Sequence, residues 1–328
     1  MDWRRRRAFP LRRLGIIGCF VAWCAGGAFA QTFPNGPISI VVPLAPGDAA
    51  DISARSMAEE MSRRLGVPVL TVNRPGAGGA IGAASVAHAR KDGQTILFAQ
   101  NSALTFRPAL DPQSASYDAQ KDLVPLGISS RTPSVLAVRS DAPYRSFAEL
   151  IEHAKKNPGQ VRIGHPGAGS VGEFCILLVN ALTGVDLVPV PYTGAAPAAT
   201  ALRGGHIEGA ALSLGALGAH IKAGALRGIA TSNRVAEYAD IPALKELGYR
   251  EDLFGIWFSY LAPAGIPEDA RKALVAAIEQ AVKAPEVGAR LAPFGIVQAY
   301  ATPEQQLAEI REEFKRVIEM AKKAGLAK

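Results

Sequence analysis

The segment most informative about the fold is ISIVVPLAPGDAADISARSMAEEMSRRL, residues 38–65. Its start is apolar and β-branched, which predicts a buried strand that ends at Pro43. A glycine-containing turn follows at residues 45–48. Beyond it, Ile52, Met57 and Met61 recur on one face of a helix. A strand, a turn and an amphipathic helix in this order predict the opening of a βαβ unit.

The same order continues along the chain. Further strands are predicted at residues 67–72, 95–99, 134–138, 161–164, 187–191, 207–212, 226–230 and 256–261. Helices are predicted at residues 80–90, 146–156, 172–183, 196–204, 267–283 and 303–324, with Ser146 as the N-cap of the second. This alternation of strands and helices predicts an α/β fold with largely parallel strands.

The length of the chain predicts two lobes, because the roughly 300 residues that follow residue 30 exceed what one hydrophobic core usually organises. The last two helices have no strand partners of their own, so we expect them to return to the first lobe. This places residues 31–131 and 255–328 in the first lobe and residues 132–254 in the second, with crossings near 128–132 and 251–256. Because ligands bind outside the carboxyl ends of such strands, we expect a ligand cleft between the lobes.

The N-terminus has the pattern of an export signal. A basic stretch at residues 4–7 precedes an apolar run at 14–25 and the triplet Ala28-Phe29-Ala30. This predicts a signal peptide that is removed after Ala30, and the apolar run is too short for a membrane span. Twin-arginine export and lipidation at Cys19 stay open as alternatives. We expect a periplasmic protein.

Charge and cysteine content narrow the functional class. Six of the 36 basic and one of the 29 acidic residues lie within residues 1–30, which leaves a net charge of +2. The basic character therefore belongs to the signal and does not indicate nucleic-acid binding. Cys175 remains alone in an apolar run, so we predict a buried, unreactive thiol. No metal site, nucleotide site or covalent cofactor is predicted.

Seven short motifs follow one another in a fixed order. They are PLAPGDAADISAR (43–55), NRPGAGGAIGA (73–83), DAQKD (118–122), GAGS (167–170), VPYTGAAPA (190–198), IKAGALR (221–227) and APAGIP (262–267). Together they resemble the periplasmic receptors of tripartite tricarboxylate transporters, also called Bug proteins. The resemblance covers almost the whole chain after residue 30.

The resemblance implies a two-lobed class II binding-protein fold that holds a ligand carboxylate through backbone amides and ordered water at facing loops. Helix N-termini after residues 46–48 and 167–170 suit this role, because their free amides and positive dipole ends favour an anion. The predicted ligand contacts are Pro46, Gly47, Asp48, Gly169, Ser170, Tyr192, Thr193 and Gly194, with Ser102 and Ser213 as second-rank lining residues. Trp257 ranks last, since hinge packing is its alternative role.

Three positions depart from the family pattern. Asp48 stands where a second glycine is usual, Ser213 where an aspartate is frequent, and Glu173 where a histidine is often found. Asp48 either turns outward or selects a ligand with an amine or fewer acid groups. Asp51 and Arg55 are four residues apart on one helix, and we interpret them as a structural pair. The turn at residues 73–79 lacks the dinucleotide-binding spacing and is interpreted as structural.

The predicted function is capture of a small organic acid by a monomeric, non-enzymatic receptor and its delivery to the membrane subunits of a tripartite transporter. A ligand sensor for a membrane signalling partner is one alternative. A secreted serine hydrolase is another, since Ser170 lies in a variant of the nucleophile elbow, and Asp186, His206 and His220 follow it. Order along the chain is weak support for a triad, because triads are defined by geometry.

Overall fold

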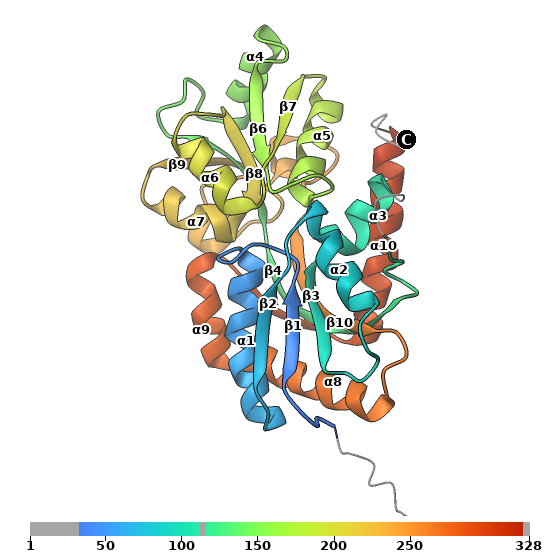
Figure 1. Cartoon of the computed structure of the whole chain (residues 1–328). Coiled ribbons are helices and arrows are strands. Elements are labelled where there is room, and N and C mark those ends of the chain that lie inside the picture. The colour runs from blue at the N-terminus through green and yellow to red at the C-terminus, as the bar shows by residue number, and fades with distance from the viewer. Residues whose placement is uncertain (1–32, 112–115, 324–328) are drawn as a thin grey trace, which may run out of the picture. The chain divides into compact units, whose positions relative to one another are not determined.

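The computed structural model describes residues 33–111 and 116–323, and the predicted signal peptide lies outside them. The strands form two mixed sheets (Figure 1). The first sheet has the order β11-β4-β10-β3-β1-β2 and the second has the order β7-β6-β8-β5-β9. The predicted α/β class with two lobes is therefore confirmed.

The first sheet is built from both ends of the chain. Its strands are β1 (Ile38–Val42), β2 (Val69–Asn73), β3 (Thr95–Gln100), β4 (Leu123–Thr132), β10 (Ile256–Pro263) and β11 (Val297–Ala301). β1 pairs in parallel with β2 and β3, whereas β10 runs antiparallel between β3 and β4. β1 and β3 are almost wholly buried and apolar, as expected of central parallel strands.

The second sheet uses the middle of the chain. Its strands are β5 (Ser134–Arg139), β6 (Val161–His165), β7 (Leu187–Pro191), β8 (Gly209–Ser213) and β9 (Leu226–Thr231). β6 pairs in parallel with β7 and β8, and β5 runs antiparallel between β8 and β9. This pattern matches the first sheet, with β6, β7 and β8 in the places of β1, β2 and β3.

Helices connect these strands. They are α1 (Ala49–Leu65), α2 (Ala80–Ala87), α3 (Arg107–Leu110), α4 (Phe147–Lys156), α5 (Val171–Thr183), α6 (Ala195–Arg203), α7 (Leu214–Lys222), α8 (Glu268–Lys283), α9 (Pro285–Leu291) and α10 (Pro303–Lys323). A π-helical turn, η2 (Ser102–Phe106), follows β3. Ser146 caps α4 by accepting a hydrogen bond from the Glu149 amide, as predicted.

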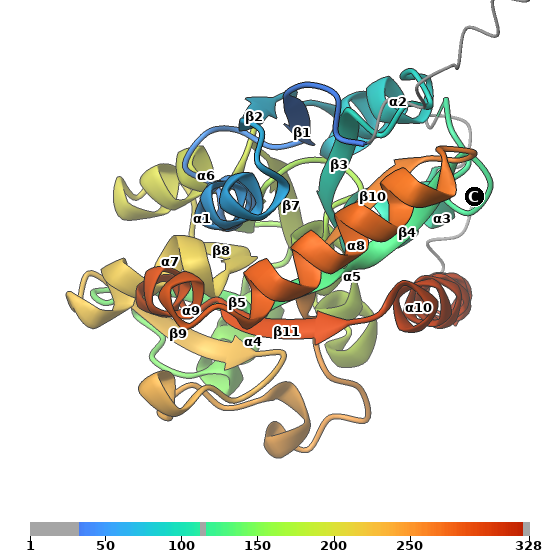
Figure 2. The same ribbon diagram turned by 90° about the horizontal axis from the view of Figure 1, so that it is seen from below.

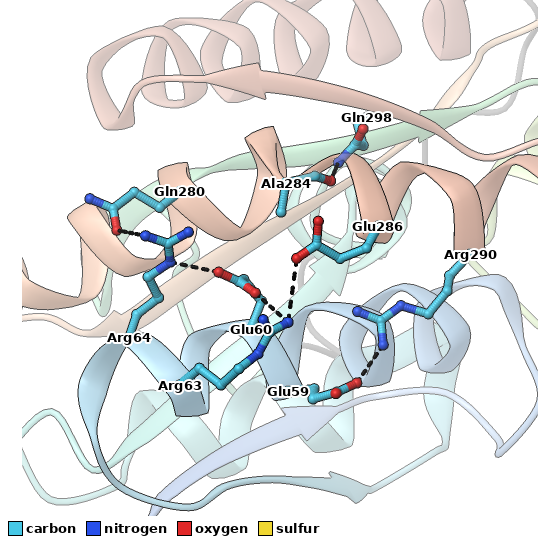
Figure 3. Close-up of polar contacts among 9 residues, drawn as sticks. All are labelled: Glu59, Glu60, Arg63, Arg64, Gln280, Ala284, Glu286, Arg290 and Gln298. Atoms are coloured by element: carbon cyan, nitrogen blue, oxygen red, sulfur yellow. Dashed lines mark hydrogen bonds and ion pairs between the residues drawn. The ribbon is translucent and has the colours of Figure 1, made fainter.

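The C-terminal helices contact the first sheet, which confirms the predicted return of the chain. Figure 2 shows α8 running across β4 and β10, with β11 and α10 beside it. α1 packs against α8 and α9. Figure 3 shows the ion pairs between these helices, where the buried Glu60 carboxylate lies between Arg63 and Arg64.

Two features correct the sequence prediction. Residues 128–132 form the end of β4, a strand that the sequence did not predict, and the chain passes to the second sheet next to them, at Pro133. Pro125 and Gly127 hide this strand from pattern analysis, and the pairing of β4 with β10 is irregular at two points. The C-terminal helices also have a strand partner, since β11 precedes α10 and pairs with β4. The exact lobe boundaries stay a prediction, while sheet membership changes at Pro133 and between β9 and β10.

Candidate ligand site

The predicted contact residues follow the carboxyl ends of equivalent strands in the two sheets. Residues 46–48 follow β1 and residues 169–170 follow β6. Residues 192–194 follow β7, Ser102 follows β3, and Ser213 ends β8. The remaining equivalent loop, after β2, is the turn at residues 74–79. Six loops therefore form the candidate site, three from each sheet.

The loops of the two sheets contact each other. A Cβ atom placed on Gly78 would lie 2.4 Å from the carbonyl oxygen of Ala168, so these backbones touch. A Cβ on Gly169 would lie 2.4 Å from Cδ of Arg107, and one on Gly194 would lie 3.7 Å from the Ala45 Cβ. Glycine is needed at positions 78 and 169, both for this approach and for their positive φ angles of 64° and 74°.

A cavity of about 600 Å³ opens between these loops. Its lining comes from residues 43–44 and 75–79 of the first lobe and from residues 166–168 and 191–193 of the second. The lining side chains are mostly proline and alanine, and Tyr192 and Thr193 supply hydroxyl groups. Cavities of this volume, with a mainly apolar lining and a few polar groups, are typical of small-molecule binding sites.

The ten predicted residues differ in exposure. Pro46, Gly47 and Thr193 are exposed and Tyr192 is half-buried. The others are buried: Asp48, Ser102, Gly169, Ser170, Gly194 and Ser213. Only Tyr192 and Thr193 of the ten line the 600 Å³ cavity. Sequence reasoning did not include Gly76, Ala77, Gly78 and Gly79, although their glycine content and their position after a strand are the signals that also marked the other loops.

The first loop is ordered by Asp51. Its carboxylate accepts hydrogen bonds from the Gly47 amide at 3.0 Å, from the Arg55 Nε at 3.0 Å and from the Asn73 Nδ2 at 2.9 Å. Although burial opposes ionisation, these donors hold the pKa of Asp51 below its usual value. The structural role predicted for Asp51 and Arg55 is confirmed, and the Gly47 amide is already hydrogen-bonded within its own loop.

Asp48 turns inward. It is 8% exposed, and its Oδ1 accepts a hydrogen bond from the Ala50 amide at 3.1 Å as the N-cap of α1. The nearby amide of Ala195, the first residue of α6 in the second lobe, also favours the ionised carboxylate. Burial raises the pKa of Asp48 to about 6. The outward orientation allowed by the sequence is therefore wrong, because the helix amides draw the carboxylate inward.

The loop after β6 is also ordered by a carboxylate of the protein. The Gly169 amide donates to Oε2 of Glu173 at 2.5 Å, and the Glu173 amide donates to the Ser170 hydroxyl at 3.2 Å. Ser170 is thus the N-cap of α5, and the Glu173 carboxylate binds the amide of the residue before the cap. Here, too, a carboxylate of the protein takes up an amide that was expected to face a ligand.

The residues of the hydrolase alternative do not lie together. β6 and β7 are parallel, and Ser170 follows the carboxyl end of β6, whereas Asp186 precedes β7. His206 likewise precedes β8, which is parallel to β6. A strand of five residues separates these ends by roughly 16 Å. The Ser170 hydroxyl instead caps α5.

His165 is the histidine beside Ser170, but its geometry does not suit a general base. Its Nδ1 lies 3.0 Å from the carbonyl oxygen of Gly167 and 3.4 Å from the Ser170 hydroxyl. Because a carbonyl only accepts, this nitrogen carries a proton and cannot take one from Ser170. Burial lowers the pKa of His165, which keeps the ring neutral.

Trp257 and Cys175 are both buried in the protein interior. Trp257 is 2% exposed, and its Nε1 donates to Oε1 of Glu313 on α10 at 3.2 Å. Burial raises the pKa of Glu313 to about 7, and Asn101 and Thr105 also donate to its carboxylate. Cys175 is buried, as predicted, and burial raises the pKa of its thiol to about 11, which disfavours the reactive thiolate. Within residues 33–111 and 116–323, no three His, Cys, Asp or Glu side chains are placed to hold a metal.

The two lobes, with glycine-rich loops facing each other across a cavity, define a solute-binding protein. Residues 53–326 match the family model described as the tripartite tricarboxylate transporter family receptor. The chain belongs to this family, whose members are solute-binding receptors. The resemblance seen in the motifs is confirmed.

Individual relatives agree with this assignment. The chain is 33% identical to BugT of Bordetella pertussis over 319 residues, which are 96% of this chain and 98% of BugT. A protein of R. palustris solved with adipate is similar at 27% identity with a TM-score of 0.85, and the match covers 90% of this chain and 99% of that one. MatC of Rhodopseudomonas palustris with bound malate is similar at 29% identity with a TM-score of 0.82, over 88% and 99% of the two chains.

In the part of the chain that the structure describes, no helix is both long and apolar enough to cross a bilayer.

Proposed function

We propose that this chain is a periplasmic receptor that captures a small carboxylate and delivers it to the membrane subunits of a tripartite transporter. The close contacts of Gly78 with the Ala168 backbone and of Gly169 with Arg107 support the proposal, because they bring loops of both lobes together around one small cavity. Family membership and the carboxylates bound to the two R. palustris proteins support it. The ligand contacts are the ten predicted residues together with the loop at residues 76–79.

In this function, ligand binding and closure of the two lobes are coupled equilibria. The ligand favours the closed arrangement only by the free energy of the contacts that it makes there and not in the open one. Gly78 contacts Ala168 and Gly169 contacts Arg107, so facing loops of the two lobes touch. A carboxylate held between the lobes would add hydrogen bonds to both sides at once.

The test is thermal unfolding of the purified protein against a panel of mono-, di- and tricarboxylates at about 1 mM. A ligand present at about 1,000 times its dissociation constant stabilises the folded state by about 4 kcal/mol. For a chain of this size, that corresponds to a rise in Tm of about 8 °C. A panel without any shift, checked by calorimetric titration of protein that was unfolded and refolded to remove bound solute, would contradict the proposal.

A further inference from the structure

One buried carboxylate lies where loops of the two lobes meet. Asp48 caps α1 by accepting a hydrogen bond from the Ala50 amide at 3.1 Å. Burial raises the pKa of Asp48, whereas the nearby backbone amides of Ala50, Ala195 and Ala49 lower it. Asp48 ends the loop after β1, which adjoins the loop after β7, because a Cβ atom on Gly194 would lie 3.7 Å from the Ala45 Cβ.

The position that Asp48 fills is one that favours an anion. Helix N-termini combine free amides with the positive end of the helix dipole, and here two of them converge on one carboxylate. In the absence of Asp48, the same amides would face the carboxylate of a ligand. The protein therefore supplies one anion to its own site.

A ligand carboxylate at this position would be repelled by the negative charge of Asp48. Burial has already raised the pKa of Asp48 to about 6, which shows that its negative charge is poorly compensated. Glu173 adds a further carboxylate at the facing loop, where it takes the Gly169 amide. Two like charges a few ångströms apart in a partly buried site repel strongly.

The residues around the site offer little positive charge that would offset this repulsion. No lysine, arginine or histidine is among the residues that line the 600 Å³ cavity. Arg107 lies beside Gly169, and its guanidinium is paired with Asp111 at 3.1 Å. A ligand group next to Asp48 is accepted best if it is uncharged or donates a hydrogen bond.

We propose that Asp48 makes this receptor selective for ligands with a single carboxylate and against dicarboxylates, because it occupies the position of a second ligand carboxylate. The ligand group facing Asp48 is then a hydrogen-bond donor, such as an amide, a hydroxyl or an ammonium group. This inference rests on the proposed function, since it concerns the ligand class of the same site.

Matched ligand pairs test the inference. Succinate, glutarate and adipate are each compared with the corresponding monoamide, which keeps the chain length and replaces one carboxylate by an amide. Dissociation constants are measured by calorimetry for the wild type, Asp48→Gly and Asp48→Asn. The asparagine variant retains a capping oxygen for the Ala50 amide, so it serves as the folded control if the glycine variant is unstable.

The wild type is expected to bind the preferred monoamide at least about 10-fold more tightly than its diacid, which corresponds to one pKa unit of charge repulsion. In both variants, this ratio is expected to fall to about one or to reverse in favour of the diacid. Equal binding of diacid and monoamide by the wild type, or an unchanged ratio in Asp48→Asn, would overturn the inference while leaving carboxylate capture intact. Failure of all three proteins to bind these six probes would overturn the inference, and failure with the full carboxylate panel would overturn the proposed function as well.

Discussion

Single glycines set how closely the two lobes approach. Gly169 has a φ angle of 74°, and a side chain there would collide with Arg107 of the other lobe. Gly184, which ends α5, has nearly the same φ angle of 70°, but a Cβ atom placed on it would have no neighbouring atom within 4 Å. A comparison of variants at these two residues therefore separates the effect of backbone strain from the effect of the contact between lobes.

We predict that Gly169→Val weakens binding of the panel's best carboxylate by at least about 10-fold, because the valine holds the loops apart. Gly184→Val is expected to leave the dissociation constant unchanged. Both variants carry strain at a positive φ angle, so each should lose about 1–3 kcal/mol of stability. Calorimetric titration and urea unfolding measure the two effects, and similar loss of binding in both variants would contradict the role of the Gly169 contact.

The buried carboxylate of Asp48 predicts an unusual dependence of stability on pH. Its pKa is raised to about 6 in the folded protein from an ordinary value of 3.8, so the folded state binds this proton more tightly than the unfolded chain. The contribution of Asp48 to the free energy of unfolding is thus full below about pH 4 and is lost as pH rises through about 6. Asp51 has a lowered pKa, and its contribution is lost only as pH falls below its ordinary value.

We expect the wild type to lose roughly 2–3 kcal/mol of stability relative to Asp48→Asn between pH 4 and pH 7.5. Urea unfolding at several pH values in this interval measures the difference. Because Asp51 is present in both proteins, its effect cancels in the comparison. Parallel stability curves for the two proteins would show that Asp48 is not buried as described.

Among the elements, α1 is attached to the C-terminal helices by a cluster of ion pairs. Glu60 has a side chain that is 2% exposed, and it pairs with Arg63 and Arg64 (Figure 3). Arg63 also reaches Glu286 of α9, and Arg64 reaches Gln280 of α8. Glu59, on the same turn of α1, is 64% exposed and pairs with Arg290. One helix thus carries a buried glutamate that pairs with two arginines of α1 and an exposed glutamate that pairs with an arginine of α9.

Glu60→Ala is predicted to lower the free energy of unfolding by about 1–2 kcal/mol, because Glu60 orients two arginines toward α8 and α9. Glu59→Ala should change it by about 0.5 kcal/mol or less, since exposed ion pairs contribute little. Urea unfolding of both variants gives the comparison. Equal losses would mean that the buried position of Glu60 adds nothing to the attachment of α1.

Across the molecule as a whole, three aromatic rings join segments that are distant in the sequence. Phe106 lies in η2, Phe174 in α5, and Phe254 just before β10. Their ring centroids are 5.1–5.3 Å apart in edge-to-face contacts. Because η2 belongs to the first lobe and α5 to the second, this cluster packs the lobes together beside the crossings of the chain.

Phe174→Ala is therefore expected to cost about 3–5 kcal/mol of stability, as removal of a buried aromatic ring usually does. Phe294, which is 38% exposed, is the matched control, and Phe294→Ala should cost about 1 kcal/mol or less. Trp257 is the one tryptophan after residue 30 in the sequence, so its fluorescence follows unfolding. Similar costs for both phenylalanines would contradict the packing role of the cluster.

Elements whose signals are local could be predicted from the amino-acid sequence. The strand at residues 187–191 and the cap at Ser146 follow from β-branched residues, turns and side-chain oxygens within a few positions of each other. The order of motifs also indicated the family. β4 and β11 were missed, because Pro125 and Gly127 oppose a strand locally, and only pairing with β10 and with each other stabilises both strands.

How the site is assembled depends on tertiary contacts. The positions of its six loops follow from the ends of predicted strands, although the loop after β2 was interpreted as structural, but the state of each amide depends on groups brought together by folding. Asp51 takes the Gly47 amide, Glu173 takes the Gly169 amide, and the buried Asp48 lies near the Ala195 amide of the other lobe. A local pattern reveals which residues can bind an anion, whereas burial and long-range contacts determine whether the protein's own carboxylates already do so.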